Sequence, residues 1–201
     1  MNQYSGNHNT GSYSQHSHQE MDLFAVHGTG AITSAGVVGY YGPLVEGLEG
    51  FGEPLYDLLE QSPYQGGIVA VAQLAPPLVF GGLRLGSTLR DDMRGLPDHE
   101  RPAFPDFVKL SQKMSVRIHV RDRLPFEHQA TLLRRNNVGP TMGRLAMIIA
   151  REVNRFMDRE RAIRNPLTHL GRELNVDDLV LVEVRHVSRG SIQPVLGVLR
   201  Q

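Results

Sequence analysis

The chain has 201 residues, 40% of them hydrophobic, and its 21 basic and 21 acidic side chains give a formal net charge of zero. That length and hydrophobic content allow one folded domain with additional chain. It contains no cysteine, which excludes disulfides, cysteine-ligated metal or iron–sulfur sites and cysteine nucleophiles. The first 20 residues are polar and lack the basic and apolar pattern expected of a secretory leader. These features fit an intracellular protein of the cytoplasm or nucleus.

The zero net charge conceals an acidic and a basic part of the chain. Residues 1–83 hold seven acidic side chains and no lysine or arginine, whereas residues 84–201 hold fourteen acidic and all 21 basic side chains. The two parts therefore carry −7 and +7. Nearly all the bases are arginine. Arginine preference is typical of phosphate or carboxylate recognition, although a GC-rich coding sequence produces the same preference.

Residues 1–21 consist of asparagine, glutamine, serine, glycine, histidine and tyrosine, with hardly an aliphatic side chain. Such a composition cannot bury enough apolar surface to offset the entropy of ordering, so it predicts a disordered polar tail. Tyr4 and Tyr13 would allow weak self-association. His16 and His18 make a poor metal site on a mobile segment, and we interpret them as solvated.

Residues 22–86 form a glycine-rich, apolar and acidic segment. We expect a short strand over 23–26, a short helix over 54–60 and an extended stretch over 66–82. The last stretch is apolar, but Gln73 and the pair Pro76-Pro77 interrupt it, so it does not predict a membrane span. It is instead expected to pack on the folded part of the chain or on a partner.

Gly28-Thr29-Gly30 was tested against known nucleotide-binding motifs. Thr33 stands where the dinucleotide fingerprint needs its third glycine, and a P-loop needs a lysine, of which the first is Lys109. Both nucleotide-binding motifs are therefore excluded at this position.

His27-Gly28 follows the apolar residues 23–26, and this pair resembles the oxyanion loop of α/β-hydrolases. The resemblance covers about 30 residues and implies that 40–48 would form the first helix of such a fold. The chain has no Gly-x-Ser-x-Gly nucleophile motif, so the sequence offers no serine for that loop to serve. A hydrolase-like enzyme is the least favoured hypothesis.

Residues 87–105 contain several charged residues and prolines and are interpreted as a linker. The folded domain is expected to cover 106–201. Within it, 107–110 and 114–120 predict two strands, the second with a buried face and a wet, basic face that carries Arg117, His119 and Arg121. Residues 125–136 predict a helix whose inward side chains are Phe126, Leu132 and Leu133.

Residues 141–163 predict one long amphipathic helix. Thr141 can cap its first turn, and Pro166 ends it after Asn165. Its apolar residues recur at three- and four-residue steps: Leu145, Ile148, Ile149, Val153, Phe156, Met157 and Ile163. That apolar face is predicted to cover a sheet.

The remaining residues predict a hairpin of two strands, 178–187 and 191–199. The first is apolar and β-branched, as in a central strand, and Ser188-Arg189-Gly190 forms the break. Pro194 cannot donate to a ladder, so the second strand is expected to be an edge or to carry a bulge. The predicted fold class is therefore α+β, a small antiparallel sheet packed by two helices in the order ββααββ.

Two surfaces are candidate partner sites. The first is a stripe on the long helix within about 80° of arc, formed by Arg144, Arg151, Arg155 and Arg159. The second is the polar turn over 187–194, which carries Ser188, Arg189 and Gln193. No histidine spacing matches a metal-ligand or catalytic pattern, and we expect no cofactor, no metal and no catalytic residue.

These features favour a non-catalytic protein-binding or assembly module, acting on a protein partner or by self-association. The alternative is an arginine-mediated nucleic-acid-binding protein, whose affinity would fall steeply with salt. The neutral chain, the few aromatic side chains and the acidic residues on the same long helix count against it.

Overall fold

The structure is a computed structural model that describes residues 55–64, 74–134 and 137–200. The predicted tail over 1–21, the predicted strand over 23–26 and the hydrolase-like stretch lie outside these residues, as do residues 66–73 of the apolar stretch over 66–82. No helix within the described ranges combines the length and the hydropathy needed to cross a bilayer.

The long helix α2 spans Met142–Ala162 and confirms the predicted helix. The Thr141 side chain accepts a hydrogen bond from the Arg144 amide, and Arg159 and Arg161 lie in the last turn, where cations suit the helix dipole. The apolar face of α2 is closed to solvent: Leu145, Ala146, Ile149, Val153 and Phe156 are each 0% exposed. Burial of this face is what attaches the helix to the sheet.

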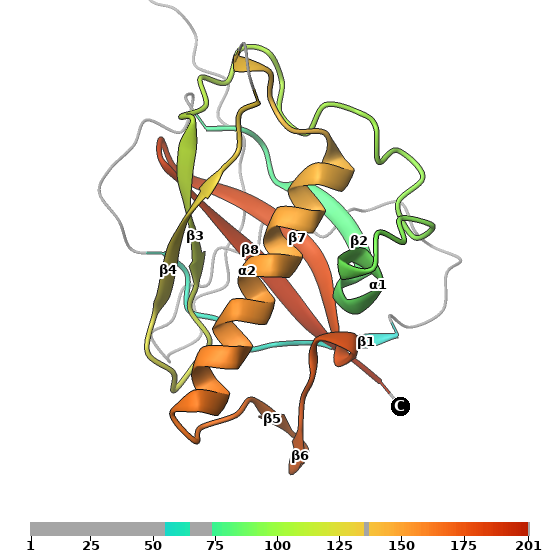
Figure 1. The fold of residues 1–201 in the computed structure, drawn as a ribbon, viewed down its shortest axis with the longest axis vertical. Coiled ribbons are helices and arrows are strands. Elements are labelled where there is room, and N and C mark those ends of the chain that lie inside the picture. Colours follow the sequence, from blue (N-terminus) through green and yellow to red (C-terminus); the bar gives the residue numbers. More distant parts are fainter. Residues whose placement is uncertain (1–54, 65–73, 135–136, 201) are drawn as a thin grey trace, which may run out of the picture. The chain divides into compact units, whose positions relative to one another are not determined.

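The sheet beneath α2 has six strands in the order β2-β7-β8-β3-β4, with β1 paired to β8 off this path. The strands are β1 Tyr56–Leu58, β2 Leu78–Arg84, β3 Lys113–Ile118, β4 Phe126–Thr131, β7 Leu179–Ser188 and β8 Ser191–Leu199. Only the β3–β8 contact is parallel. Figure 1 shows α2 lying across one face of the sheet, with β3 and β4 to one side and the short helix α1, Leu85–Leu89, to the other.

Smaller elements connect α2 to β7. They are the strand pair β5, Thr168–His169, and β6, Arg172–Glu173, followed by the 3-10 helix Val176–Asp178. Asn175 and Asp178 form a capping box around that last turn. The α+β class is thus confirmed, but the order ββααββ is wrong, since two strands and α1 precede β3 and one long helix covers the sheet.

Strand β8 explains how a proline can lie inside the sheet. On one side β8 pairs with β7, and on the other it meets β3 at its start and β1 at its end. Between those two neighbours the Gln61 side chain replaces a strand, because its amide donates to the Pro194 carbonyl at 2.9 Å and accepts from the Leu196 amide at 2.7 Å. The carbonyl and amide positions of one strand residue point to the same side, so the donor that Pro194 lacks would face Gln61 and not β7. Strand β8 is therefore central, and only this short stretch behaves as the predicted edge.

Strand β4 corrects the helix predicted over 125–136. It pairs with β3 in unbroken antiparallel register, from Ile118↔Phe126 to Lys113↔Thr131. Phe126, Ala130 and Leu132 face the core together because they are spaced by even numbers, a period of two that the helical interpretation missed. Good helix formers in this stretch were overridden by pairing with β3.

Two further predictions were wrong. Residues 54–60 were expected to form a helix, but Tyr56–Leu58 is strand β1. Its close crossing over β8 requires a glycine, since a Cβ on Gly197 would lie 2.7 Å from the Tyr56 ring. Residues 107–110 were expected to form a strand and contain none.

The described parts of 22–86 and 87–105 belong to the same core as the later residues. Strand β2 pairs with β7, and Leu96, Ala103 and Phe104 from the predicted linker are buried. The boundaries at 86 and 105 remain predictions, because shared packing does not say which part folds alone.

Phe156 tests the packing of α2 on the sheet. It is 0% exposed, and its ring centroid lies 5.8 Å from that of Phe126 on β4. Phe156→Ala should lower the free energy of unfolding by about 3–5 kcal/mol, through lost burial and the cavity left behind. Ile163→Ala, at the exposed end of the helix, should cost less than about 0.5 kcal/mol. Equal losses in urea unfolding would contradict this packing.

Candidate binding groove over helix α2

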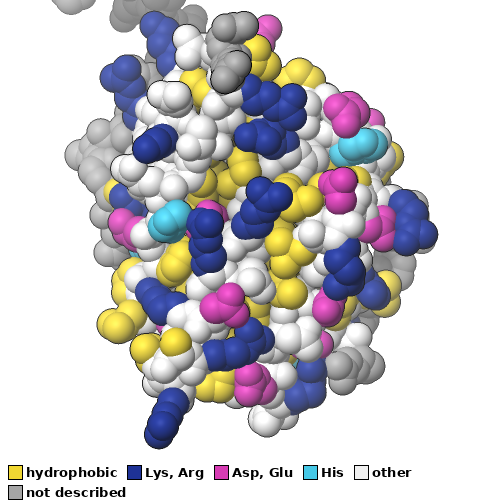
Figure 2. Space-filling model, viewed as in Figure 1, with side chains coloured by type: hydrophobic (Ala, Val, Ile, Leu, Met, Phe, Trp, Pro, Cys, Tyr) yellow, Lys and Arg dark blue, Asp and Glu magenta, His cyan; other side chains and the backbone are white. Residues whose placement is uncertain are grey.

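A broad depression of about 780 Å³ runs over the first half of α2, between β4 and the segment after α1. We call it the α2 groove. Its helix residues are Thr141, Gly143, Arg144, Met147, Ile148, Arg151, Glu152 and Arg155, and its β4 side consists of His128, Gln129, Ala130 and Thr131, followed by Arg134. The opposite bank is formed by Leu89, Asp91, Met93, His99 and Glu100. Figure 2 shows lysine and arginine side chains gathered along the line of α2 on this face.

Three arginines of the α2 groove have no side-chain partner among the described residues. The guanidinium groups of Arg134, Arg144 and Arg151 make no hydrogen bond or ion pair with any described residue, and the Arg144 Nε is buried without an acceptor. Met147, Ile148 and Ala130 provide an apolar surface beside them. A guanidinium held next to apolar surface favours a carboxylate or phosphate, because its planar fork can donate two parallel hydrogen bonds.

The fourth arginine of the groove is held by a buried carboxylate. Arg155 donates to Glu152 Oε1 at 2.7 Å, and the Glu152 side chain is only 5% exposed. The other oxygen, Oε2, lies 2.9 Å from His128 Nδ1. Arg155 also approaches that nitrogen, at 3.3 Å. Oε2 accepts no hydrogen bond from the described residues, so its contact with the ring is an ion pair, which is attractive when the imidazole is protonated. Glu152 thus ties β4 to α2 at the wall of the groove.

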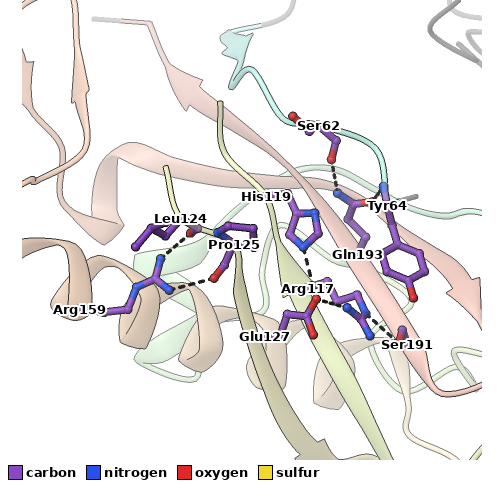
Figure 3. A network of polar contacts seen from close by, with 10 residues as sticks. All are labelled: Ser62, Tyr64, Arg117, His119, Leu124, Pro125, Glu127, Arg159, Ser191 and Gln193. Carbon is purple, nitrogen blue, oxygen red and sulfur yellow. Dashed lines mark hydrogen bonds and ion pairs between the residues drawn. The ribbon is translucent and has the colours of Figure 1, made fainter. Parts of the chain in front are cut away.

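Arg159, although predicted as part of the same stripe, has a structural role. Its guanidinium donates to the Leu124 and Pro125 carbonyls at 2.8 and 3.1 Å (Figure 3). It also donates to Glu160 at 2.7 Å. It also lies 5.3 Å from the centroid of the Phe126 ring. These contacts fasten the end of α2 to the β3–β4 turn, so Arg159 is not available to a partner.

The first helical amides of α2 are also occupied. The Met142 amide donates to the Arg101 carbonyl and the Gly143 amide to the His99 carbonyl, both at 2.8 Å. The helix N-terminus therefore offers no free donors to an anion in the groove. Any recognition of negative charge there falls to the arginine side chains.

The basic residues predicted on β3 lie on the other face of the sheet. Val116 and Ile118 point into the core under α2, so Arg117 and His119 point away from it. Arg117 donates to Ser191 at 2.9 Å, pairs with Glu127 and stacks 4.3 Å above the Tyr64 ring (Figure 3). This cluster does not adjoin the α2 groove, and Glu127 neutralises the charge of Arg117.

The second predicted site, the turn over 187–194, is only partly exposed. Arg189 is exposed at the tip, and Ser188 is half-buried. Gln193 is 5% exposed and holds the segment before β2, because it donates to the Ser62 carbonyl at 2.8 Å and accepts from the Tyr64 amide at 3.0 Å. The predicted exposure of Gln193 was wrong, and the residue holds chain segments together.

A smaller hollow of about 480 Å³ lies within residues 91–99. Its arginine is already engaged, since Arg94 donates to Asp92 at 2.7 and 2.9 Å. Those bonds lower the pKa of Asp92 to about 2. The hollow carries no unpaired group comparable with Arg151.

No protein-family model, curated protein or solved structure matches this chain. Nowhere in the described ranges do three histidine, aspartate or glutamate side chains gather as a metal site would require. The α2 groove is a mostly polar depression that combines some apolar surface with guanidinium groups that have no partner among the described residues.

Arg144, Arg151 and Arg155, predicted from the sequence as partner-binding, lie on the groove, but the sequence analysis missed its β4 side. His128, Gln129 and Thr131 were assigned to a helix, so their place beside α2 could not be seen. The even spacing of Phe126, His128 and Ala130 was the available signal.

The Glu152–His128 contact can be tested by a double-mutant cycle. His128→Ala removes the ion-pair partner of Glu152 Oε2 and should lower the free energy of unfolding by about 1 kcal/mol, because the buried carboxylate loses the imidazole beside it. In a Glu152→Met background, where no buried carboxylate remains, the same change should cost little. Equal costs in the two backgrounds, measured by urea unfolding, would show that the contact contributes nothing.

The surroundings of His186, a second histidine in the structure, indicate its protonation state. The residue is 6% exposed, and its Nδ1 accepts from the Ala75 amide at 3.0 Å, so the ring is neutral with its proton on Nε2. Burial disfavours the charged ring and lowers the pKa of His186 below its usual 6.5, with hydrogen bonds at Ser188 and Arg189 opposing that effect.

A pH dependence of stability follows from this lowered pKa. The unfolded chain takes up a proton at His186 near pH 6.5, which the folded chain resists, so stability is full above that pH and falls as the pH drops below it. His186→Gln keeps an acceptor for Ala75 but cannot titrate, and should show a smaller fall in the free energy of unfolding between about pH 7.5 and 5. Parallel pH profiles for the two proteins would rule out this role.

Proposed function

We propose that this protein is a non-catalytic protein-binding module, and that the α2 groove binds a segment of a partner protein that carries carboxylate and aliphatic side chains. The supporting observation is that Arg134, Arg144 and Arg151 lack any acceptor among the described residues while they border apolar surface. Such an arrangement fits a ligand that supplies both the missing acceptors and apolar contact. An intracellular location, cytoplasmic or nuclear, belongs to the same proposal and fits the absence of cysteine.

The groove suits a peptide better than a phosphate backbone. Asp91 and Glu100 on its far bank would repel a continuous row of phosphates, whereas a peptide can place its carboxylates at the arginines alone. Met147 and Ile148 would contact aliphatic side chains of the partner and exclude water around the ion pairs, which strengthens them.

Nucleic-acid binding is the second candidate, because the same unpaired arginines could neutralise phosphates. Binding of nucleic acid would depend more steeply on salt than binding of a peptide, and it would not depend on apolar side chains in the ligand. Neutralising several phosphates would make the affinity fall by orders of magnitude between low and moderate salt, with a slope proportional to the number of contacts.

The proposal is tested with the full chain and a fluorescein-labelled peptide of alternating glutamate and valine. Arg134→Glu combined with Arg151→Glu should weaken binding at least about tenfold, which is ~1.4 kcal/mol, because attraction becomes repulsion. Arg189→Glu is the matched control. It makes the same Arg→Glu reversal once, on an exposed arginine at the β7–β8 turn, and should leave the affinity unchanged, whereas Arg151→Glu alone should weaken it.

Three outcomes would overturn the proposal. Loss of binding with Arg189→Glu alone would show that the peptide binds at the β7–β8 turn and not in the α2 groove. Equal affinity for a peptide with glutamine in place of glutamate would remove the role of charge. Tighter, steeply salt-dependent binding of single-stranded oligonucleotides would favour the nucleic-acid alternative.

A further inference from the structure

The two strands that end the main strand order, β2 and β4, differ in their ability to accept another strand. Edge strand β2 is irregular, because its register with β7 shifts between Val79 and Leu83 and Gly81 and Gly82 have φ values of 64° and 91°. Irregular edges of this kind resist pairing with another chain. Edge strand β4 pairs with β3 in continuous register, and no other described strand pairs with it.

Hydrogen bonds near β4 show which of its backbone groups face outward. The Leu132 amide donates to the Gln112 carbonyl at 3.0 Å, so Leu132 faces β3. Alternate residues of an antiparallel strand bond to opposite sides, so His128 and Ala130 also face β3, whereas Gln129 and Thr131 direct their amides and carbonyls away from it. The residue of β3 opposite Gln129 supports this assignment. The Ser115 amide donates to the Gly190 carbonyl, on the side of β3 away from β4, and so does not bond to Gln129.

The outward backbone of β4 lies along the α2 groove. Successive strand side chains point to opposite faces, yet His128, Gln129, Ala130 and Thr131 all line the same depression. The groove therefore reaches around the edge of β4 as well as over α2. A groove bounded by an open strand edge and a helix matches the sites in which a peptide is bound as an added strand.

We infer that β4 accepts an added strand from a partner protein, and that this strand is the acidic, aliphatic segment of the proposed function, on which the inference rests. The outward groups of Gln129 and Thr131 hydrogen-bond the backbone of the segment. Its alternate side chains, which point toward α2, meet Arg144 and Arg151. The three arginines without acceptors argue for carboxylates on that strand, since charge complementarity then fixes its position along β4.

Gln129→Pro tests the backbone contact directly. It removes an outward amide without touching the bonds to β3, and proline is tolerated on the outer side of an edge strand. Binding of the alternating glutamate–valine peptide should weaken at least about tenfold, whereas Gln129→Lys, which keeps the amide, should bind as the natural protein does. Unchanged urea unfolding would show that Gln129→Pro still folds.

The peptide offers a second test that needs no change in the protein. N-methylation of alternate peptide amides on one edge should abolish binding, and methylation on the other edge should leave it intact. On addition of the unmodified peptide, hydrogen exchange at the Gln129 and Thr131 amides should slow, with no comparable change at His128.

The outcomes separate this inference from the proposed function. Binding that depends on Arg151 but survives both Gln129→Pro and either pattern of N-methylation would retain the groove and overturn the added strand. Dimers of the chain alone, dissociated by the peptide and by Gln129→Pro, would assign the edge to a second copy and overturn a heterologous partner.

Discussion

Burial of one face of α2 against the sheet is the interaction on which the rest of this structure depends. Leu145, Ile149, Val153 and Phe156 are all closed to solvent, and the strands beneath them come from both ends of the described chain. Removing this helix would expose the core side of β3, β4, β7 and β8 together. Hydrophobic burial is non-directional, so the orientation of α2 is set by polar contacts at the helix margins: Glu152 to His128 on β4, and Arg159 to the Leu124 and Pro125 carbonyls.

Those marginal contacts also determine which arginines remain free. Arg155 and Arg159 are engaged in holding α2 to β4 and to the turn before it. Arg144 and Arg151 lie nearer the helix start and contact no acceptor among the described residues, and Arg134 joins them from the segment after β4. The arginines of this helix thus have two roles: some hold the helix to the sheet, and others are available to a partner. The available ones lie beside β4, the regular edge strand of the sheet.

The sequence was informative where its pattern was long and the burial one-sided. The three- and four-residue spacing from Leu145 to Met157 predicted α2, and the β-branched run of β7 predicted a central strand. It failed for β4, where glutamate, glutamine and alanine favour a helix until pairing with β3 overrides them. It also could not tell Arg151 from Arg159, because the acceptors of Arg159 are carbonyls about 35 residues away in sequence. Long-range pairing of this kind leaves no local trace.

The most direct test of this account is a map of backbone amide chemical shifts in the isotope-labelled full chain as the acidic, aliphatic peptide is added. The account predicts that the largest changes fall in two sequence-distant groups, residues 128–131 on β4 and residues 144–155 on α2, and that they saturate together. Changes centred on Tyr64, Arg117 and Ser191, on the opposite face of the sheet, would contradict it.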